Sequence, residues 1–174
     1  MLSALLQRLG AAPGWLQRRA ERAERMPIRD WVGLGYKRVA GRTFSDVDMN
    51  DQAYLMSPAG AFGPSFLVLE NFQVIRRYNT SDLYATFVGN LADRIAGGGD
   101  FVTPWKDIGP QRTRIIRGVQ EGLQKAGYAI GKIDGFIGSG TRREAGQYQR
   151  KNGLKVDCWP TQALLDHLNR RAPR

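Results

Sequence analysis

The sequence predicts an α+β protein that is mainly helical, with a small antiparallel sheet in its first part and three helices at its C-terminal end. Three observations support this fold class. Apolar side chains recur every three or four residues in several segments, which is typical of amphipathic helices. Three short β-like runs, separated by turn residues, lie between residues 36 and 69. A stretch rich in glycine and proline, residues 97–110, then divides the chain.

The first 27 residues are predicted to form a basic amphipathic arm. Leucines at positions 2, 5, 6 and 9 share one face of a helix expected over residues 2–9, and a second helix is expected over 15–25. Gln7 and Arg8 interrupt the apolar start, and further arginines follow it, so we expect no secretory signal. No run of 18 apolar residues occurs, and we therefore expect no membrane span.

Residues 28–99 are expected to hold a short helix, the sheet and two longer helices. The short helix is predicted over 28–34. The strands follow over residues 36–39, 53–56 and 65–69. Asn71 suits the N-cap of a helix over 72–78, and Ser81 suits the N-cap of a helix over 82–96, because their short polar side chains accept hydrogen bonds from free backbone N–H groups.

Residues 100–110 are predicted to be a linker, and residues 111–174 a separate three-helix domain. Its helices are expected over residues 111–126, 141–152 and 161–170. The loop between the first two holds Gly131, Gly135 and Gly138, which permit tight turns. The apolar side chains in it, Ile133, Phe136 and Ile137, are expected to plug the loop into the core.

The formal net charge of +10 is concentrated at the C-terminal end. Residues 111–174 carry thirteen basic against five acidic side chains, which gives +8. A basic segment indicates an anionic partner, and nucleic acid, acidic lipid headgroups and the carboxylates of peptidoglycan stem peptides all qualify. A solvated basic face without a partner is the alternative. No cofactor or metal is expected, because Cys158 and His167 by themselves cannot form a zinc site.

The motifs around the glycine loop resemble the peptidoglycan-binding domain common in cell-wall hydrolases. The matching residues are Leu123-Gln124, Gly127-Tyr128, Gly131 to Arg142, Tyr148-Gln149, Gly153-Leu154 and Asp157. Their order and spacing agree with that family over most of residues 111–174. Cys158 departs from the pattern, since the family more often has glycine after the aspartate, and this affects the local turn rather than the fold.

This resemblance implies peptidoglycan as the partner, with its glycan or stem peptide held in a shallow groove beside the loop. The implied site residues are Asp134, Gly135, Gly138, Thr141, Arg142 and Tyr148. The basic side chains that could meet stem-peptide carboxylates are Lys132, Arg142, Arg143 and Lys155. Exposed ion pairs are individually weak, so the affinity is expected to be modest and sensitive to salt. The alternative is that several of these residues serve the fold first.

A second cluster lies where two helices are predicted to meet. Tyr78, Asn79, Ser81 and Tyr84 bring two phenol rings, an amide and a hydroxyl to one junction. Sugars bind to flat aromatic surfaces flanked by paired hydrogen-bond donors and acceptors, so this cluster is a candidate glycan groove. The alternative is a capped helix junction with both tyrosines half buried.

Residues 28–99 resemble the C-terminal part of the membrane-bound lytic transglycosylase B family. The matching stretches are Trp31-x-x-Leu34-Gly35, Pro58-Ala59-Gly60-x-x-Gly63-Pro64, Asn71-Phe72-x-Val74-Ile75, Arg77-Tyr78-Asn79-x-Ser81-x-x-Tyr84-Ala85 and Leu91-Ala92-Asp93-Arg94. The resemblance implies that the tyrosines and asparagine of the junction line a glycan groove. It also implies a periplasmic location.

The family cleaves the MurNAc–GlcNAc bond without water. One glutamic acid protonates the leaving oxygen and then acts as base for the sugar's own hydroxymethyl group, which yields a 1,6-anhydro product. In that family the acid lies upstream, in a Glu-Ser segment, and this sequence contains no Glu-Ser pair. None of its five glutamates, Glu21, Glu24, Glu70, Glu121 and Glu144, occupies the corresponding position.

Three functions follow from these observations. The first is a truncated transglycosylase-like protein that binds peptidoglycan and is inactive alone. The second is a transglycosylase that becomes active when a partner chain supplies the missing half. The third is a basic nucleic-acid binder, which is disfavoured because the aromatic residues are not interleaved with the basic ones and no nucleic-acid motif is present.

Overall fold

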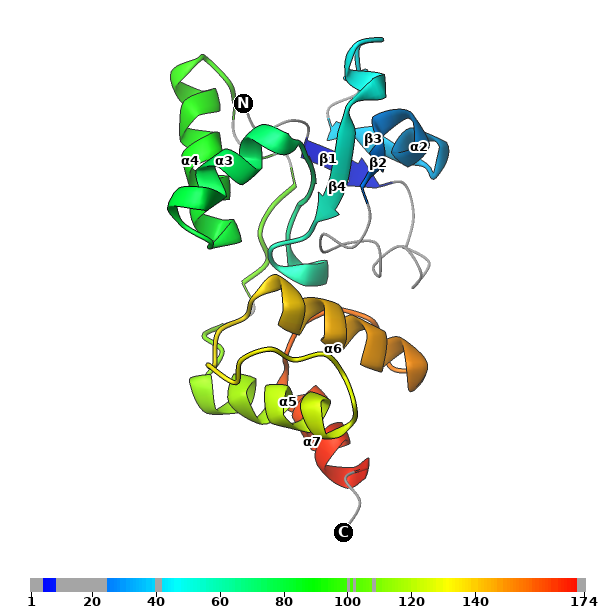
Figure 1. Cartoon of the computed structure of the whole chain (residues 1–174), viewed down its shortest axis with the longest axis vertical. Helices are drawn as coiled ribbons and strands as arrows, with labels where there is room; N and C mark the ends of the chain where they lie inside the picture. The colour runs from blue at the N-terminus through cyan, green and yellow to red at the C-terminus, as the bar shows by residue number, and fades with distance from the viewer. Residues whose placement is uncertain are drawn as a thin grey trace. The chain divides into compact units, whose positions relative to one another are not determined.

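The computed structural model describes residues 5–8, 25–39, 42–99, 101, 103–107 and 109–171 (Figure 1). These residues form two compact units. The first unit holds the described residues up to Pro58 and those from Gly63 to Trp105. The second holds Ala59–Phe62 and the described residues from Lys106 onward. Each unit has a hydrophobic core of its own.

The first unit is built on an antiparallel sheet whose strands lie in the order β2-β4-β5-β1-β3. These strands are β1 (Leu5–Arg8), β2 (Met26–Pro27), β3 (Tyr36–Arg38), β4 (Gln52–Met56) and β5 (Ser65–Val68). In the central pair, Tyr54 lies opposite Val68 and Met56 opposite Phe66. The small antiparallel sheet and its three predicted strands are thereby confirmed.

The helix predicted over residues 2–9 is wrong where the structure describes it. Leu5–Arg8 form β1, which pairs with β3 on one side and β5 on the other. A central strand exchanges backbone hydrogen bonds along both edges, and this pairing overrides the weak helical preference of a short segment. The rest of that helix lies outside the described residues, as does the helix predicted over 15–25 apart from Arg25, which is not helical.

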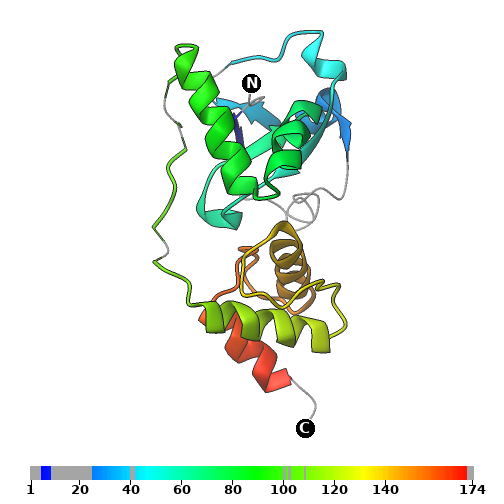
Figure 2. The same ribbon diagram turned by 60° about the vertical axis from the view of Figure 1, so that its left-hand side comes forward.

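Alternating side chains of the sheet enter two cores, one on each face. On one face, α2 (Ile28–Gly33) contributes Ile28 and Trp31, which pack against Ala53, Leu55 and Leu67 of the sheet. The other face is covered by α3 (Glu70–Tyr78) and α4 (Asp82–Ile95), which lie beside each other (Figures 1 and 2). The residues buried there are Tyr54, Met56, Phe66, Val68, Phe72 and Ala85.

The two predicted helix caps in this unit have different outcomes. Ser81 is the N-cap of α4, and its Oγ accepts a hydrogen bond from the backbone N–H of Tyr84 at 3.3 Å. The predicted cap at Asn71 is wrong, because α3 begins at Glu70 and its N-cap is Leu69, which makes no side-chain cap bond. Asn71 therefore lies inside the first turn of α3.

The second unit contains the three predicted C-terminal helices, which are confirmed as α5 (Thr113–Lys125), α6 (Ser139–Lys151) and α7 (Gln162–Arg171). Their shared core consists of Val119, Leu123, Ile130, Ala145, Tyr148, Leu164 and Leu168. Helices α5 and α7 approach closely at Gly118 and Gly122, where a Cβ would lie 3.0–3.1 Å from side-chain atoms of Leu165 and Leu168.

Residues Ala59–Phe62, which precede β5 in the chain, belong to this second unit. The backbone N–H of Ala61 donates to the carbonyl of Asp157 at 2.9 Å, and the rings of Phe62 and Trp159 meet edge to face. Gly60 has a φ of 55°, and a Cβ there would lie 2.3 Å from the Asp157 carbonyl oxygen. Glycine is therefore required at this contact.

Candidate functional site

One buried side chain, that of Gln120 on α5, fixes the glycine loop. Its Nε2 donates to Asp134 Oδ1, the Phe136 carbonyl and Thr141 Oγ1 at 3.1–3.2 Å. Its Oε1 accepts the backbone N–H of Gly135 at 2.9 Å. A single amide thus satisfies polar groups across the loop and at the start of α6, which gives the loop one defined shape.

Asp134 and Gly135 make the turn itself. Asp134 Oδ1 accepts the backbone N–H of Phe136 at 2.9 Å. That hydrogen bond is the main cause that lowers the pKa of Asp134 below its usual value, with Gln120 and Lys132 adding to it against the opposing effect of burial. Gly135 has a φ of 77°, and a Cβ there would lie 2.4 Å from Cγ2 of Thr113.

A second glutamine, Gln149 on α6, makes a comparable clamp at the next turn. Its Oε1 accepts the backbone N–H groups of Asp157 and Cys158, and its Nε2 donates to Asp157 Oδ1 at 2.6 Å. Asp157 Oδ1 also accepts the N–H of Trp159. Cys158 has a φ of 56°, a left-handed conformation that favours glycine, so this departure from the family pattern occupies a glycine-like position.

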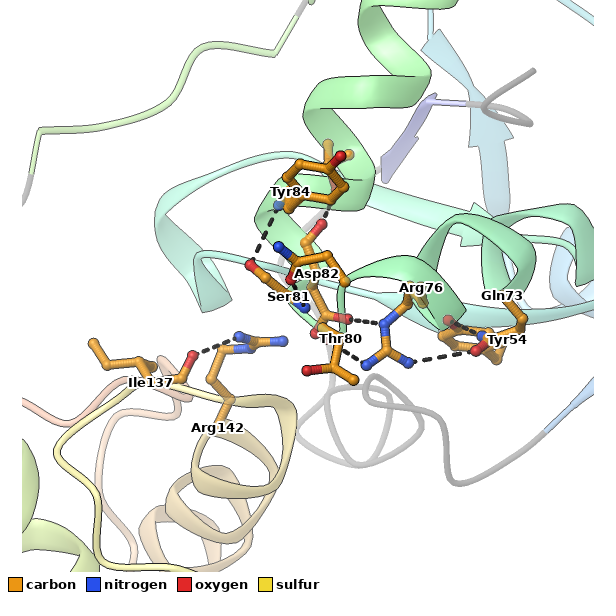
Figure 3. Close-up of polar contacts among 11 residues, drawn as sticks. Tyr54, Gln73, Arg76, Thr80, Ser81, Asp82, Tyr84, Ile137 and Arg142 are labelled. Carbon is orange, nitrogen blue, oxygen red and sulfur yellow. Dashed lines mark hydrogen bonds and ion pairs between the residues drawn. The ribbon is translucent and has the colours of Figure 1, made fainter.

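The predicted module residues mostly take part in this internal network. Thr141 is buried, and its Oγ1 accepts a hydrogen bond from Gln120 Nε2. Arg142 is buried, and its guanidinium donates to the Ile137 carbonyl at 3.1 Å (Figure 3). Tyr148 is buried with its hydroxyl 2.9 Å from His167 Nδ1, and burial raises its pKa. Gly138 precedes α6 as its N-cap.

The loop exposes one aromatic ring that was expected to be buried. Ile133 packs against the core as predicted, but Phe136 is 74% exposed. Its backbone is held on both sides by Gln120 and Asp134, and this fixed turn directs the ring away from the core. The basic side chains of Lys132 and Lys155 are also exposed, whereas Arg143 lies 2.9 Å from Glu144.

In the first unit, the predicted groove residues do meet at the α3–α4 junction. The rings of Tyr78 and Tyr84 are stacked, with centroids 6.1 Å apart and an interplanar angle of 29°. Asn79 Oδ1 accepts the backbone N–H of Ser81 at 2.9 Å, and Ser81 caps α4. Tyr78 is 86% exposed, so the outer ring offers an open aromatic face.

A buried ion pair braces this junction (Figure 3). Arg76 Nε lies 3.1 Å from Asp82 Oδ1, and their side chains are only 11% and 6% exposed. The Arg76 guanidinium also donates to the Thr80 carbonyl at 2.6 Å, which fixes the turn between the helices.

The clamps and this brace were not predicted from the sequence. A signal was available for Gln120, because it lies on the same helical stripe as Ile116, Val119 and Leu123, where a polar side chain must find partners. Nothing in the sequence indicated that Arg76 is buried, since an arginine near a helix end usually faces solvent.

The described residues hold no helix that is both long and apolar enough to cross a bilayer. Within the same residues, no three His, Cys, Asp or Glu side chains are grouped to bind a metal ion.

Comparison with known proteins finds one family model for each unit. A family model described as "Transglycosylase SLT domain" matches residues 7–93, and one described as "Putative peptidoglycan binding domain" matches residues 115–168. No curated protein matches the chain. That the chain belongs to the membrane-bound branch of the transglycosylases stays a prediction.

Two crystal structures of SltB3 from Pseudomonas aeruginosa are similar to nearly the whole chain. The structure in complex with NAG-anhNAM-pentapeptide has 36% identity and a TM-score of 0.79 over 95% of this chain. The structure in complex with NAG-NAM-pentapeptide has 37% identity and a TM-score of 0.78 over the same share. The chain spans 44% and 45% of those SltB3 chains.

The α3–α4 junction and all of the sheet except the first two residues of β1 lie within the first matched range, and the clamped glycine loop lies within the second. The first range alone makes up half of the 174 residues. The chain therefore belongs to the transglycosylase SLT domain family and carries a peptidoglycan-binding domain C-terminal to the SLT domain.

Proposed function

We propose that the chain binds peptidoglycan through its second unit. The observation that carries this proposal is the loop between α5 and α6, whose backbone is held in one shape by Gln120. A surface that is ordered before binding loses little conformational entropy on binding. The family match over residues 115–168 and the muropeptide complexes of SltB3 support the same ligand. The site of action is then the cell-wall space.

Sedimentation with purified murein sacculi at low salt tests this proposal. We expect the chain to pellet with sacculi and to remain in solution without them. Gln120→Leu removes the clamp, and because it leaves the Gly135 N–H and the Thr141 hydroxyl without their partner, we expect it to reduce pelleting. A wild-type chain that stays in the supernatant, or that retards DNA on a gel as strongly as it binds sacculi, contradicts the proposal.

The α3–α4 junction is proposed as a glycan groove within the same function. Its support is the exposed ring of Tyr78, stacked on Tyr84 beside the polar groups of Asn79 and Ser81. Tyr78→Ala should weaken binding to peptide-free glycan strands. Val74→Ala is the matched control, because Val74 is also exposed and lies on the same helix. Equal binding by both variants contradicts the groove.

We further propose that the chain alone does not cleave the glycan. A general acid must reach the bond it protonates. Glu70 begins α3 and Tyr78 ends it, so the two are roughly 12 Å apart along the helix axis at 1.5 Å per residue. Glu70 is also exposed and paired with Arg25. Glu121 and Glu144 belong to the second unit. Release of anhydro-muropeptides from sacculi by the purified chain contradicts this proposal.

A transglycosylase completed by a partner chain is the second candidate, and α4 favours it. Leu83, Phe87, Leu91 and Ile95 repeat at every fourth position and are 48–80% exposed. An apolar stripe of this length is normally covered by another element. The occupant that fits is an apolar surface of the portion of a transglycosylase such as SltB3 that this chain does not span.

Reconstitution distinguishes the two candidates. The SltB3 segment outside the match is added as a separate polypeptide, and anhydro-muropeptide release is measured. Activity that appears only in the mixture and is lowered by Phe87→Ser supports completion by a partner. No activity in the mixture leaves peptidoglycan binding as the function.

A further inference from the structure

We propose that Phe136 and Arg117 form the contact surface of the second unit for the anionic stem peptide of peptidoglycan. This inference rests on the proposed function and identifies the ligand portion and the residues that meet it. The observation behind it is the exposed Phe136 ring, which no core requires to be aromatic. An apolar ring in water is unfavourable, and aromatic and arginine side chains are enriched where proteins bind their partners.

Hydrogen bonds on both sides hold the backbone that carries the Phe136 ring. The N–H of Phe136 donates to Asp134 Oδ1 at 2.9 Å, and its carbonyl accepts from Gln120 Nε2 at 3.1 Å and from the N–H of Gly138 at 3.1 Å. The preceding residue, Gly135, also donates its backbone N–H to Gln120 Oε1. Binding to this ring therefore orders little backbone, which favours affinity.

Two cationic side chains lie close to the turn that carries the ring. The Cγ and Nε atoms of Arg117 lie 3.1 Å from the place a Cβ would take on Gly135, so this arginine lies against the loop next to Phe136. Arg117 is exposed, and among the described residues no ion pair holds it. Lys132 lies near enough to Asp134 to lower the pKa of that carboxyl. Lys132 thus lies on the loop that carries the ring, and Arg117 of α5 lies against that loop.

This combination selects the stem peptide over the sugar chain. A guanidinium binds a carboxylate through two parallel hydrogen bonds, and stem peptides carry carboxylates, whereas the glycan backbone supplies hydroxyl and acetamido groups without charge. The alanine methyl groups of the peptide give the Phe136 ring an apolar partner. A neutral glycan would leave Arg117 without an anionic partner.

Sedimentation of the full chain with two probes tests the assignment. One probe is intact sacculi, and the other is insoluble chitin, a neutral polymer of N-acetylglucosamine that carries no peptide. We expect binding to intact sacculi to exceed binding to chitin. Phe136→Ser should weaken binding to intact sacculi about 5-fold or more, as for a central aromatic contact. Arg117→Gln should weaken it about 2- to 5-fold.

Matched variants control for general effects. Val47→Ser removes an equally exposed apolar side chain from the first unit, and Arg170→Gln removes one positive charge from α7, so both should bind within about 2-fold of the unmodified chain. Phe136→Tyr keeps the ring and should bind normally. Circular dichroism confirms that each variant is folded, which is expected because the substituted side chains are exposed.

Each outcome decides the assignment. Wild-type binding with no loss in Phe136→Ser overturns it and leaves the proposed function intact. Equal binding to intact sacculi and to chitin, or equal losses in Arg117→Gln and Arg170→Gln, also overturns it with the same consequence. A wild-type chain that binds neither probe overturns both the inference and the proposed function.

Discussion

Single residues set the backbone of the loops in the second unit. Gly135 has a φ of 77° and contacts Thr113, where no side chain fits. Cys158 takes a φ of 56° at the corresponding place in the other clamped turn, and its Sγ lies 2.5 Å from where a Cβ would be on Gly146. Glycine at 146 thus accommodates the cysteine at 158.

Gly135→Ala should destabilise the second unit by about 2 kcal/mol or more, because a left-handed conformation is unfavourable for alanine and its Cβ would clash with Thr113. Urea unfolding measures this change. Gly131→Ala is the control, since nothing lies within 4 Å of a Cβ there, and it should change stability by less than about 0.5 kcal/mol. Equal effects of the two substitutions would refute this account.

The contact between Gly146 and Cys158 predicts a non-additive pair. Gly146→Ala should cost about 1–3 kcal/mol through overpacking against Sγ. Adding Cys158→Gly removes Sγ and suits the left-handed φ, so the double variant should recover most of that loss. A double-mutant cycle in urea measures the coupling. Simple addition of the two single effects contradicts the prediction.

The Asp134 carboxylate predicts a pH dependence. Hydrogen bonds lower its pKa in the folded state, so its contribution is complete above the unfolded value of 3.8 and is lost as the pH falls through the lower folded pKa. The free energy of unfolding should therefore decrease as the pH drops below about 4. Asp134→Asn should show a flatter profile in that range. Identical profiles for both chains contradict this role.

At the scale of elements, the α3–α4 junction depends on one buried ion pair. Arg76 and Asp82 hold the turn on which Tyr78 and Ser81 stand. The tyrosine stack is therefore a consequence of helix packing rather than of the tyrosines alone.

Arg76→Leu should destabilise the first unit by about 3–5 kcal/mol, because it removes the guanidinium that is paired with the buried Asp82 carboxylate. Arg77→Leu is the matched control, since Arg77 is the next residue and exposed, and its cost should be under about 0.5 kcal/mol. Thermal and urea unfolding report both. A similar cost for the two variants shows that the ion pair does not brace the junction.

Across the whole molecule, charge should govern affinity for the wall. Residues 111–174 carry thirteen basic against five acidic side chains, which would attract the anionic polymer of the proposed function, and salt screens such attraction. Pelleting with sacculi should weaken several-fold between about 50 mM and about 300 mM sodium chloride, as the Debye length shortens. Salt-independent binding indicates a contact dominated by apolar groups.

Much of the fold could be predicted from local pattern. The helices of the second unit follow the spacing of Ile116, Val119 and Leu123, and β4 and β5 lie between evident turns. β1 could not be predicted in this way, because its leucines fit a helix and only pairing with β3 and β5 makes it a strand. The candidate residues at the α3–α4 junction were likewise found from sequence, whereas the Arg76–Asp82 brace required the structure.

The sequence by itself determined which segments are helices in the second unit, where the glycine loop falls, and the resemblance to wall-binding transglycosylases, because periodicity and turn residues are local properties. Tertiary structure decided which polar side chains are buried as clamps and which aromatic ring remains outside. Gln120 lies inside and Phe136 outside because hydrogen-bond geometry around Gly135 directs them so, and that geometry arises only when α5, the loop and α6 pack together.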